Sequence, residues 1–296
     1  MRFIVGKEQS PNTGSARIGL TSVYLVQGDK AVNLSAHDIS IGEDLRSLIV
    51  SDNLYERVSA LAATSPQVPL DSIAPELPIA DPGKIICLGL NYIDHIEEGG
   101  YTVPDYPALF MRSRSSLMSA GKPMIRPNCS PQLDYEAELM VIIGKPGKHI
   151  REQDALCHVF GYTVFNDGSI RDYQRKTHQW TPGKNFDATG AIGPFVVTPE
   201  ELPEGAVGLK IESRVGDEIL QSSTTSDMLW SVAKVISIIS GYTSLEAGDL
   251  IAMGTPPGVG HARSPQRWLH PGEVVEVEIE GIGICASPVV AEEGIV

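Results

Sequence analysis

The sequence predicts an α+β protein that is mainly β, in which a compact mixed sheet follows a small N-terminal domain. From residue 84 onward, short apolar runs bounded by glycine and proline recur, which is typical of buried strands. These runs lack the regular helical spacers of a doubly wound parallel sheet, so a mixed architecture is favoured. In residues 274–279, valine and isoleucine alternate with glutamate, as in a half-exposed strand.

The N-terminal segment carries no recognisable chemical motif. Residues 20–26 are predicted to form a strand and residues 44–63 one or two helices. A stretch with five prolines between residues 66 and 82 follows, which is typical of an extended linker. We therefore expect a small accessory domain at residues 1–75 and a larger domain at residues 76–296.

Composition and charge limit the class of protein. The chain has 296 residues and a formal net charge of −14, which argues against binding to nucleic acid or to an anionic membrane surface. We find no apolar run long enough to span a bilayer and no N-terminal signal peptide, so we expect a cytoplasmic protein. The four cysteines are widely scattered without Cys-x-x-Cys spacing, so we expect reduced, buried thiols, with neither a disulfide framework nor a zinc site.

A pair of glutamates, Glu136 and Glu138, leads directly into the apolar run at residues 139–143. That run is short, β-branched at its end and closed by Gly144, so it is predicted to be a buried strand. Because side chains alternate across a strand, the two carboxylates point the same way, a few ångströms apart. Burying two like charges costs several kcal/mol unless a positive charge lies between them, and a divalent cation is the simplest answer.

A third carboxylate, Asp167, follows another predicted strand at residues 162–165. It would lie where that strand ends, just before a helix that Ser169 and Asp172 are expected to start as a capping box. Taken alone, Asp167 is more often only a turn residue. Together with the two glutamates, it predicts a site of hard oxygen ligands without histidine or thiol. Such a site suits Mg²⁺ or Mn²⁺, with Ca²⁺ as a third candidate.

Two further segments carry polar groups suited to an anionic substrate. Arg171 and Gln174 are three residues apart and would share one face of a short helix. Lys184 lies in a glycine-flanked loop, where it would bind a carboxylate or a developing enolate, although a solvated surface lysine is the commoner case. In residues 254–260, backbone N–H groups and the Thr255 hydroxyl could bind the same anion, or the segment is simply a tight turn.

His95 and Glu98 form a candidate acid–base pair. They follow a predicted strand at residues 85–88, and one helical turn would bring the imidazole and the carboxylate together. Gly99 and Gly100 come next and are typical of a hinge, so the turn is a candidate lid over a substrate. A lone surface histidine usually has no role, and only this position between a strand end and a glycine hinge favours one.

The order and spacing of these motifs resemble the fumarylacetoacetate hydrolase superfamily over residues 84–290. The resemblance extends to the acylpyruvase, fumarylpyruvate hydrolase and 2-hydroxyhepta-2,4-diene-1,7-dioate isomerase branches. It rests on residues 89–98, 134–138, 161–167, 169–174, 183–187, 226–228 and 254–260. It implies a mixed β-roll behind a small N-terminal accessory domain, and a homodimer.

The resemblance also implies roles for individual residues. The metal ligands are expected to be Glu136, Glu138 and Asp167. The catalytic residues are expected to be His95, Glu98 and Lys184. The substrate-binding residues are expected to be Tyr92, Arg112, Arg171, Gln174 and Thr255. Arg112 stands where many relatives have lysine, so it would bind the far end of a substrate bidentately where lysine acts as a point charge.

The implied reaction is hydrolysis of an acylpyruvate-type 2,4-dioxo acid to pyruvate and a second carboxylic acid. The metal would stabilise the pyruvyl enolate, and His95, backed by Glu98, would deprotonate the water that attacks the C4 carbonyl. The same enolate would serve decarboxylation of an oxaloacetate-type acid. It would also serve isomerisation or tautomerisation of a 2-oxo-diene dicarboxylate, where His95 or Lys184 only moves a proton. A catalytically silent protein that binds a metal and a carboxylate is the remaining alternative.

Overall fold

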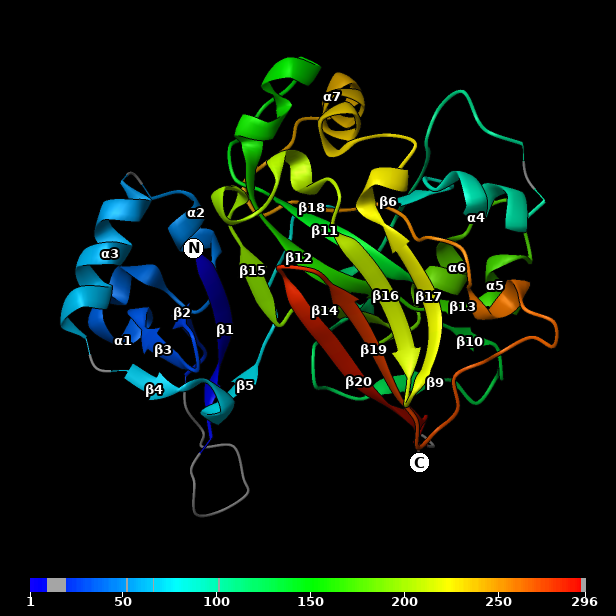
Figure 1. Ribbon diagram of the computed structural model, residues 1–296, viewed down its shortest axis with the longest axis horizontal. Helices are drawn as coiled ribbons and strands as arrows, with labels where there is room; N and C mark the ends of the chain where they lie inside the picture. The colour runs from blue at the N-terminus through cyan, green and yellow to red at the C-terminus, as the bar shows by residue number, and fades with distance from the viewer. Residues whose placement is uncertain (10–19, 52, 66, 101, 294–296) are drawn as a thin grey trace.

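A small N-terminal lobe and a larger body lie side by side in the computed structural model, which describes residues 1–9, 20–51, 53–65, 67–100 and 102–293 (Figure 1). The described strands form sheets of thirteen, five and two strands. The strands are β1 (Arg2–Glu8), β2 (Ser22–Gln27), β3 (Lys30–Asn33), β4 (Gln67–Pro69), β5 (Ile73–Pro75), β6 (Ile85–Gly89), β7 (Ala108–Met111), β8 (Leu117–Ser119), β9 (Met124–Arg126), β10 (Leu133–Asp134), β11 (Ala137–Ile143), β12 (Val159–Asp167), β13 (Ser169–Ile170), β14 (Gly190–Ile192), β15 (Phe195–Val197), β16 (Lys210–Val215), β17 (Glu218–Thr224), β18 (Leu250–Ala252), β19 (Val274–Ile279) and β20 (Gly283–Ala291).

Most of the described α-helices are single turns, and only α3 and α7 among them are longer than six residues. They are α1 (Leu34–His37), α2 (Arg46–Ile49), α3 (Leu54–Thr64), α4 (Ile93–Glu98), α5 (Arg171–Gln174), α6 (Thr181–Lys184) and α7 (Val232–Tyr242). Across the described ranges, no helix has the length and apolar character needed to cross a membrane.

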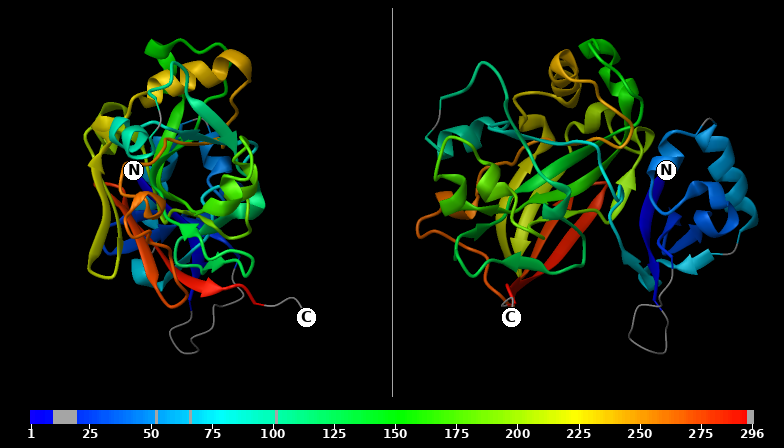
Figure 2. Two further views of the ribbon diagram at one scale, coloured as in Figure 1. Left: turned by 90° about the vertical axis from the view of Figure 1, so that its right-hand side faces the viewer. Right: turned by 180° about the vertical axis from the view of Figure 1, so that it is seen from behind.

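The N-terminal lobe adds its strands to one edge of the main sheet. Its strands run in the order β4-β3-β2-β1, and β1 then pairs antiparallel with β15 of the body. The strand and helices expected in residues 20–63 are present as β2, α2 and α3. Figures 1 and 2 show the lobe and α4 at opposite ends of the molecule. The expected domain boundary after residue 75 stays a prediction, because the sheet itself continues from lobe to body.

Strands β11 and β12 pair antiparallel in the middle of the main sheet, and every residue of both strands is buried. The burial follows from an apolar core on each face of β11. Leu139 and Val141 pack into one cluster, whereas Met140 and Ile142 pack into another that includes residues of the N-terminal lobe. A strand with two buried faces has an unbroken apolar sequence, which confirms the buried strand predicted at residues 139–143.

The five-stranded sheet has the strand order β17-β16-β19-β20-β9. It packs against the main sheet, and an apolar core lies between the two sheets (Figure 1). Val141 and Val164 of the main sheet share one cluster with Ile211 and Val277 of this second sheet. The alternation predicted in residues 274–279 is confirmed, since every second residue of β19 is buried. In the main sheet β18 is parallel to β6 and antiparallel to β11, so the mixed, mainly β class is confirmed.

The expected capping box after Asp167 is wrong. Ser169 belongs to β13, which pairs with β10, and α5 begins only at Arg171 without a side-chain cap. The Ser169 hydroxyl instead donates to the Asp167 carbonyl at 2.9 Å. Asp172 accepts from the Ser130 hydroxyl at 2.6 Å. The short strand therefore takes up Ser169, and Asp172 lies inside α5 rather than at its start.

The cysteines are all free, as expected for a chain without a disulfide framework. Cys87 and Cys285 are buried, but Cys129 and Cys157 are exposed, so the expectation of four buried thiols is wrong for two of them. Burial raises the pKa of the Cys87 thiol well above its ordinary value and that of Cys285 to about 12, so both are inert packing groups.

Candidate metal centre and active site

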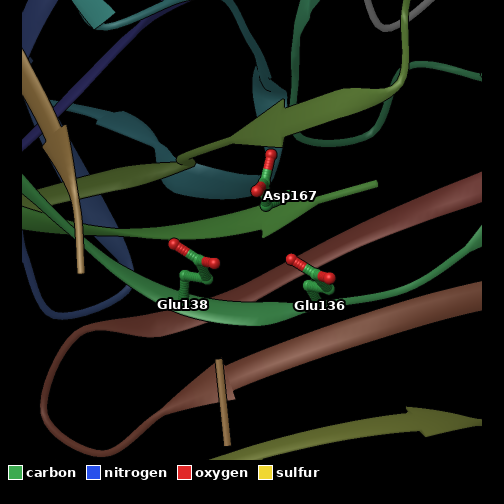
Figure 3. A group of neighbouring side chains, drawn as sticks. All are labelled: Glu136, Glu138 and Asp167. Atoms are coloured by element: carbon green, nitrogen blue, oxygen red, sulfur yellow. The ribbon is translucent and has the colours of Figure 1, made fainter. Parts of the chain in front are cut away.

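Glu136, Glu138 and Asp167 converge at the ends of the two central strands (Figure 3). One carboxylate oxygen from each lies within 4.8 Å of the others, and all three residues are buried. Strand pairing places them together, because the backbone N–H of Asp167 donates to the Glu136 carbonyl at 2.9 Å. The alternation of side chains along a strand then turns Glu138 to the same side as Glu136.

Three cations compensate two of the carboxylates. Lys184 Nζ lies 2.7 Å from Glu136 Oε2 and 2.6 Å from Asp167 Oδ2. Arg171 pairs with the other oxygen of Glu136, and Arg112 pairs with Asp167. Burial alone would raise the pKa of Glu136, but Lys184 and Arg171 outweigh it and hold that pKa below its ordinary value. Glu136 is therefore ready to act as an anionic ligand.

Glu138 differs from the other two carboxylates. Within the described residues it has no ion-pair partner, and its Oε2 accepts one hydrogen bond, from the Gly254 N–H at 2.9 Å. Burial, followed by the charges of Asp167 and Glu136, raises its pKa well above the ordinary value. A buried, uncompensated carboxylate beside two others fits a divalent cation, because the added positive charge would remove this repulsion. The all-oxygen donor set suits Mg²⁺, Mn²⁺ or Ca²⁺.

A cavity opens above Glu136 and Glu138. Its lining brings together residues from α4, β7, α5, α6 and the loop after β18. The lining residues are Leu88, Gly89, Leu90, His95, Gly99, Phe110, Glu136, Glu138, Arg171, Gln174, Arg175, Trp180, Lys184, Thr255, Val259, His261 and Ala262. None of them comes from the N-terminal lobe, so the described site is built from the body alone.

The candidate lid α4 brings His95 and Glu98 together as expected. His95 Nδ1 lies 3.4 Å from Glu98 Oε2, and His95 lines the cavity. The two oxygens of Glu98 accept the Gly258 N–H at 3.0 and 3.1 Å. Glu98 thus orients the imidazole and also ties the helix to the loop on the far side of the cavity.

The glycine-rich loop has a different role from the one expected. Its backbone N–H groups bind carboxylates of the protein itself: Gly254 binds Glu138, Gly258 binds Glu98, and Gly260 binds Asp134 at 2.8 Å. Glycine is required at residue 260, because a Cβ there would collide with the backbone carbonyl of residue 267. The loop organises the site's carboxylates, and these N–H groups are not left for a substrate anion.

Arg171, Gln174, Lys184 and Thr255 all lie on the cavity lining, as the sequence predicted. Arg171 and Gln174 share a face of α5, and Arg171 Nη1 donates to Gln174 Oε1 at 2.9 Å. Lys184 is not in an open loop, since it ends the helical turn α6 and is only 1% exposed. The carboxylates of Glu136 and Asp167 outweigh burial and raise the pKa of Lys184, so it remains an ammonium ion.

Arg112 lies outside the cavity lining, so the structure offers no support for the expectation that it binds the far end of a substrate, which stays a prediction. Its guanidinium is buried behind Asp167, and its donors are used by Asp167, the Gly168 carbonyl, Ser116 and Thr189. Four of its five N–H groups are used in this way, and the side chain is fully buried. Arg112 instead holds the Asp167 carboxylate in place.

Tyr92 also lies outside that lining, although it was expected to bind substrate. It is 1% exposed, and its hydroxyl has no hydrogen-bond partner among the described residues. Burial, followed by the charge of Glu138, raises its pKa, so the phenol stays protonated. Tyr92 directly precedes α4 and lines a different cavity, together with Asp227 and Met228.

Sequence reasoning missed several residues of the lining, among them Arg175, Trp180 and His261. Trp180 stands edge-on to the Phe110 ring, with ring centroids 5.5 Å apart. His261 comes from the loop after β18, whereas Arg175 directly follows α5. No spacing or motif in the sequence connects these positions, because only the folded loops bring them to one cavity.

Comparison with known proteins agrees with this geometry. A sequence model of the fumarylacetoacetate hydrolase C-terminal family matches residues 84–290. An oxaloacetate tautomerase of Xenopus laevis, described as mitochondrial, is 38% identical over 286 residues, which cover 95% of this chain and 88% of that protein. A human protein of the same description is 37% identical over 267 residues, covering 89% of this chain and 85% of that protein. The solved structure of a fumarylacetoacetate hydrolase from Exiguobacterium antarcticum has a TM-score of 0.83 and 31% identity, covering 99% of this chain and 100% of that chain. The chain therefore belongs to the fumarylacetoacetate hydrolase family of enzymes.

Proposed function

We propose that this chain is a divalent-metal-dependent tautomerase that interconverts the keto and enol forms of oxaloacetate or a closely related 2-oxo dicarboxylic acid. The observation that carries the proposal is the common cavity of His95, Glu136 and Glu138, which sets an acid–base group beside a candidate metal site. The choice of substrate follows the oxaloacetate tautomerases that are up to 38% identical to this chain over 95% of its length.

A divalent ion bound to Glu136, Glu138 and Asp167 would supply the positive charge that stabilises the enolate of a 2-oxo acid. The chain's own residues then have to orient the substrate and move one proton. Arg171, Gln174 and Thr255 offer donors on the cavity wall to the C1 carboxylate and the C2 oxygen.

His95 is the residue that moves the proton. Its imidazole gives a proton to C3 as the enol becomes the ketone, and it takes that proton back in the reverse direction. Glu98, 3.4 Å from His95 Nδ1, holds the ring and stabilises the imidazolium that forms between these steps. The proton that leaves the C2 oxygen is taken up by the neutral His95 imidazole, which becomes the imidazolium that protonates C3. The buried Lys184 ammonium keeps its own proton and balances the negative charge on the C2 oxygen.

Hydrolysis of an acylpyruvate-type 2,4-dioxo acid is the second candidate function. The observation that favours it is the His95–Glu98 dyad itself, because a carboxylate-backed imidazole can also activate water. A related alternative is decarboxylation of an oxaloacetate-type acid, which needs the same enolate and no water. The three reactions differ in what is released from the substrate, so they can be separated in solution.

The experiment is a substrate panel with and without Mg²⁺ or Mn²⁺. The ultraviolet absorbance of the enol follows tautomerisation of oxaloacetate, while separate assays follow pyruvate and CO₂. We expect metal-dependent loss of oxaloacetate enol without pyruvate or CO₂. Release of pyruvate and acid from acetylpyruvate or fumarylpyruvate, with no effect on the enol, would replace the proposal by the hydrolase. CO₂ release from oxaloacetate would replace it by the decarboxylase.

The assembly and the compartment are also proposals. We propose a homodimer, on the basis of the family resemblance, and light scattering or analytical ultracentrifugation would test it. A cytoplasmic location stays a prediction, and the named relatives are described as mitochondrial.

A further inference from the structure

The cavity has a cation that the proposed mechanism does not use. Two of its basic side chains are already paired: Arg171 with Asp134 and Glu136, and Lys184 with Glu136 and Asp167. Arg175 is different. In the described part of the chain its guanidinium has no hydrogen bond and no ion pair, although it lines the same cavity. An uncompensated arginine in a substrate cavity is a binding group for an anion.

Arg175 lies at the outer part of the site. It directly follows α5, whose buried Arg171 and Gln174 face the carboxylates, and it is itself exposed to solvent. The neighbouring Lys176 is also exposed, but its ammonium lies over the Tyr173 ring, 3.3 Å from the ring centroid, and it does not line the cavity. Only one of two adjacent cations is therefore directed to the site.

His261 lines the cavity with Arg175 and comes from the loop after β18. The backbone N–H of His261 donates to Asp134 Oδ2 at 2.9 Å, and this bond fixes the backbone at that position. Burial, followed by the charges of Arg175 and Arg171, lowers the pKa of His261, which places the ring in their positive field. A neutral imidazole in that field still offers one N–H donor to an anion.

We infer that Arg175, with His261 beside it, binds the distal carboxylate of a dicarboxylic substrate and so selects dicarboxylates over 2-oxo acids with a neutral tail. The position of the substrate rests on the proposed function, in which the 2-oxo acid end lies at Glu136, Glu138 and Asp167. A dicarboxylate then has one end at the candidate metal site and the other at the only arginine or lysine in the described lining that lacks a carboxylate partner.

The test compares two ligands that differ at the distal end. One is 3,3-difluoro-oxaloacetate, which has both carboxylates but no C3 proton to lose. The other is oxalate, which has the chelating end alone. Calorimetry in the presence of Mg²⁺ measures the affinity of each ligand for the full-length wild type and for Arg175→Gln, His261→Asn and Lys176→Gln. Lys176→Gln is the matched control, because it removes the adjacent exposed cation.

Arg175→Gln is expected to weaken binding of difluoro-oxaloacetate about tenfold and of oxalate by less than about twofold, since one charge-assisted contact is lost. His261→Asn should weaken binding of difluoro-oxaloacetate by a smaller factor. Lys176→Gln should leave the affinity for both ligands unchanged. If Arg175→Gln changes the affinity for both ligands by the same factor, or changes neither affinity, the inference is overturned. If the wild type fails to tautomerise oxaloacetate but keeps an Arg175-dependent preference for the dicarboxylate, the proposed function fails while the distal site stands.

Discussion

The carboxylate cluster of Glu136, Glu138 and Asp167 is buried in the body of the protein, whereas the lid, helix α4, is largely exposed. Glu138 and Asp167 belong to strands in which every residue is buried, and their oxygens are fixed by Gly254, Lys184 and Arg112. In the six-residue helix α4, only Ile96 is buried, and one carboxylate, that of Glu98, ties the helix to the loop after β18.

The two regions are suited to two different tasks, metal binding and proton transfer. Residues buried among many contacts open only with the whole protein, whereas a short, exposed helix can open locally at low cost. We therefore expect metal binding to depend on the strands and not on the lid, and proton transfer to depend on both. Substitutions in the strands and in the lid should therefore have separable effects on metal binding and on turnover.

Replacing Glu138 by alanine should abolish both metal binding and turnover. The change removes one of three ligands from a site that cannot rearrange, and we expect activity to fall at least about a thousandfold. Titration with Mn²⁺ by calorimetry, together with the enol assay, measures both properties. Glu56→Ala, an exposed change on α3, is the control. Turnover that survives while metal binding is lost would show that the cluster is not the catalytic metal site.

Replacing His95 by alanine should lower turnover and leave metal binding intact. The loss of a general acid–base group is expected to lower the rate by about 10²–10⁴-fold. The Mn²⁺ affinity should stay within about twofold of the wild type, because His95 contacts none of the three carboxylates. Glu97→Ala, an exposed change in the same helix, is the matched control. Full activity of His95→Ala would remove the lid from the mechanism.

Replacing Lys184 by methionine should destabilise the strand region in a metal-dependent way. The change removes the counter-ion that Glu136 and Asp167 share and leaves each of them with a single arginine, so we expect a loss of about 3 kcal/mol in the metal-free protein. Saturating Mg²⁺ should restore part of this loss, because the ion replaces the missing charge. Urea unfolding with and without Mg²⁺ measures the difference. An equal loss in both conditions would mean that the ion does not bind beside Lys184.

Replacing Glu138 by glutamine should stabilise the metal-free protein, and the gain should grow as the pH rises above 4.5. Burial and the charges of Asp167 and Glu136 raise the pKa of Glu138 above its ordinary value of 4.5. Its contribution to stability is therefore present below pH 4.5 and lost as the pH rises through the pKa of the folded state. The variant should match the wild type near pH 4.5 and exceed it at pH 8, as measured by urea unfolding in chelator. A difference that does not change with pH would contradict the assigned repulsion.

The features of the site that could be predicted from the sequence are those that depend on one strand or one helical turn. The pattern at Glu136, Glu138 and the following apolar run depends only on alternation along one strand, so both the strand and the convergence of the two carboxylates could be predicted. The His95–Glu98 contact depends on one helical turn and could be predicted as well. These features are local, and local spacing is visible in the sequence.

The rest depends on contacts between distant segments. Arg112 was expected to bind substrate, but the fold directs it to Asp167, and no spacing relates these two residues. The N–H groups of Gly254 and Gly258 were expected to bind an anion, and the anions turned out to be the protein's own glutamates. The position of Arg175 in the cavity could not be predicted, because it depends on how segments distant in the sequence fold around it.

The most direct test of the metal centre is a crystal structure of the wild type grown with Mn²⁺, with data collected for anomalous scattering. We predict a single strong anomalous peak in contact with oxygens of Glu136, Glu138 and Asp167, at about 2.0–2.3 Å from each. The same peak should appear in crystals of His95→Ala and be absent from Glu138→Ala. No peak between the three carboxylates of the wild type at saturating Mn²⁺, or a peak that persists in Glu138→Ala, would contradict the account.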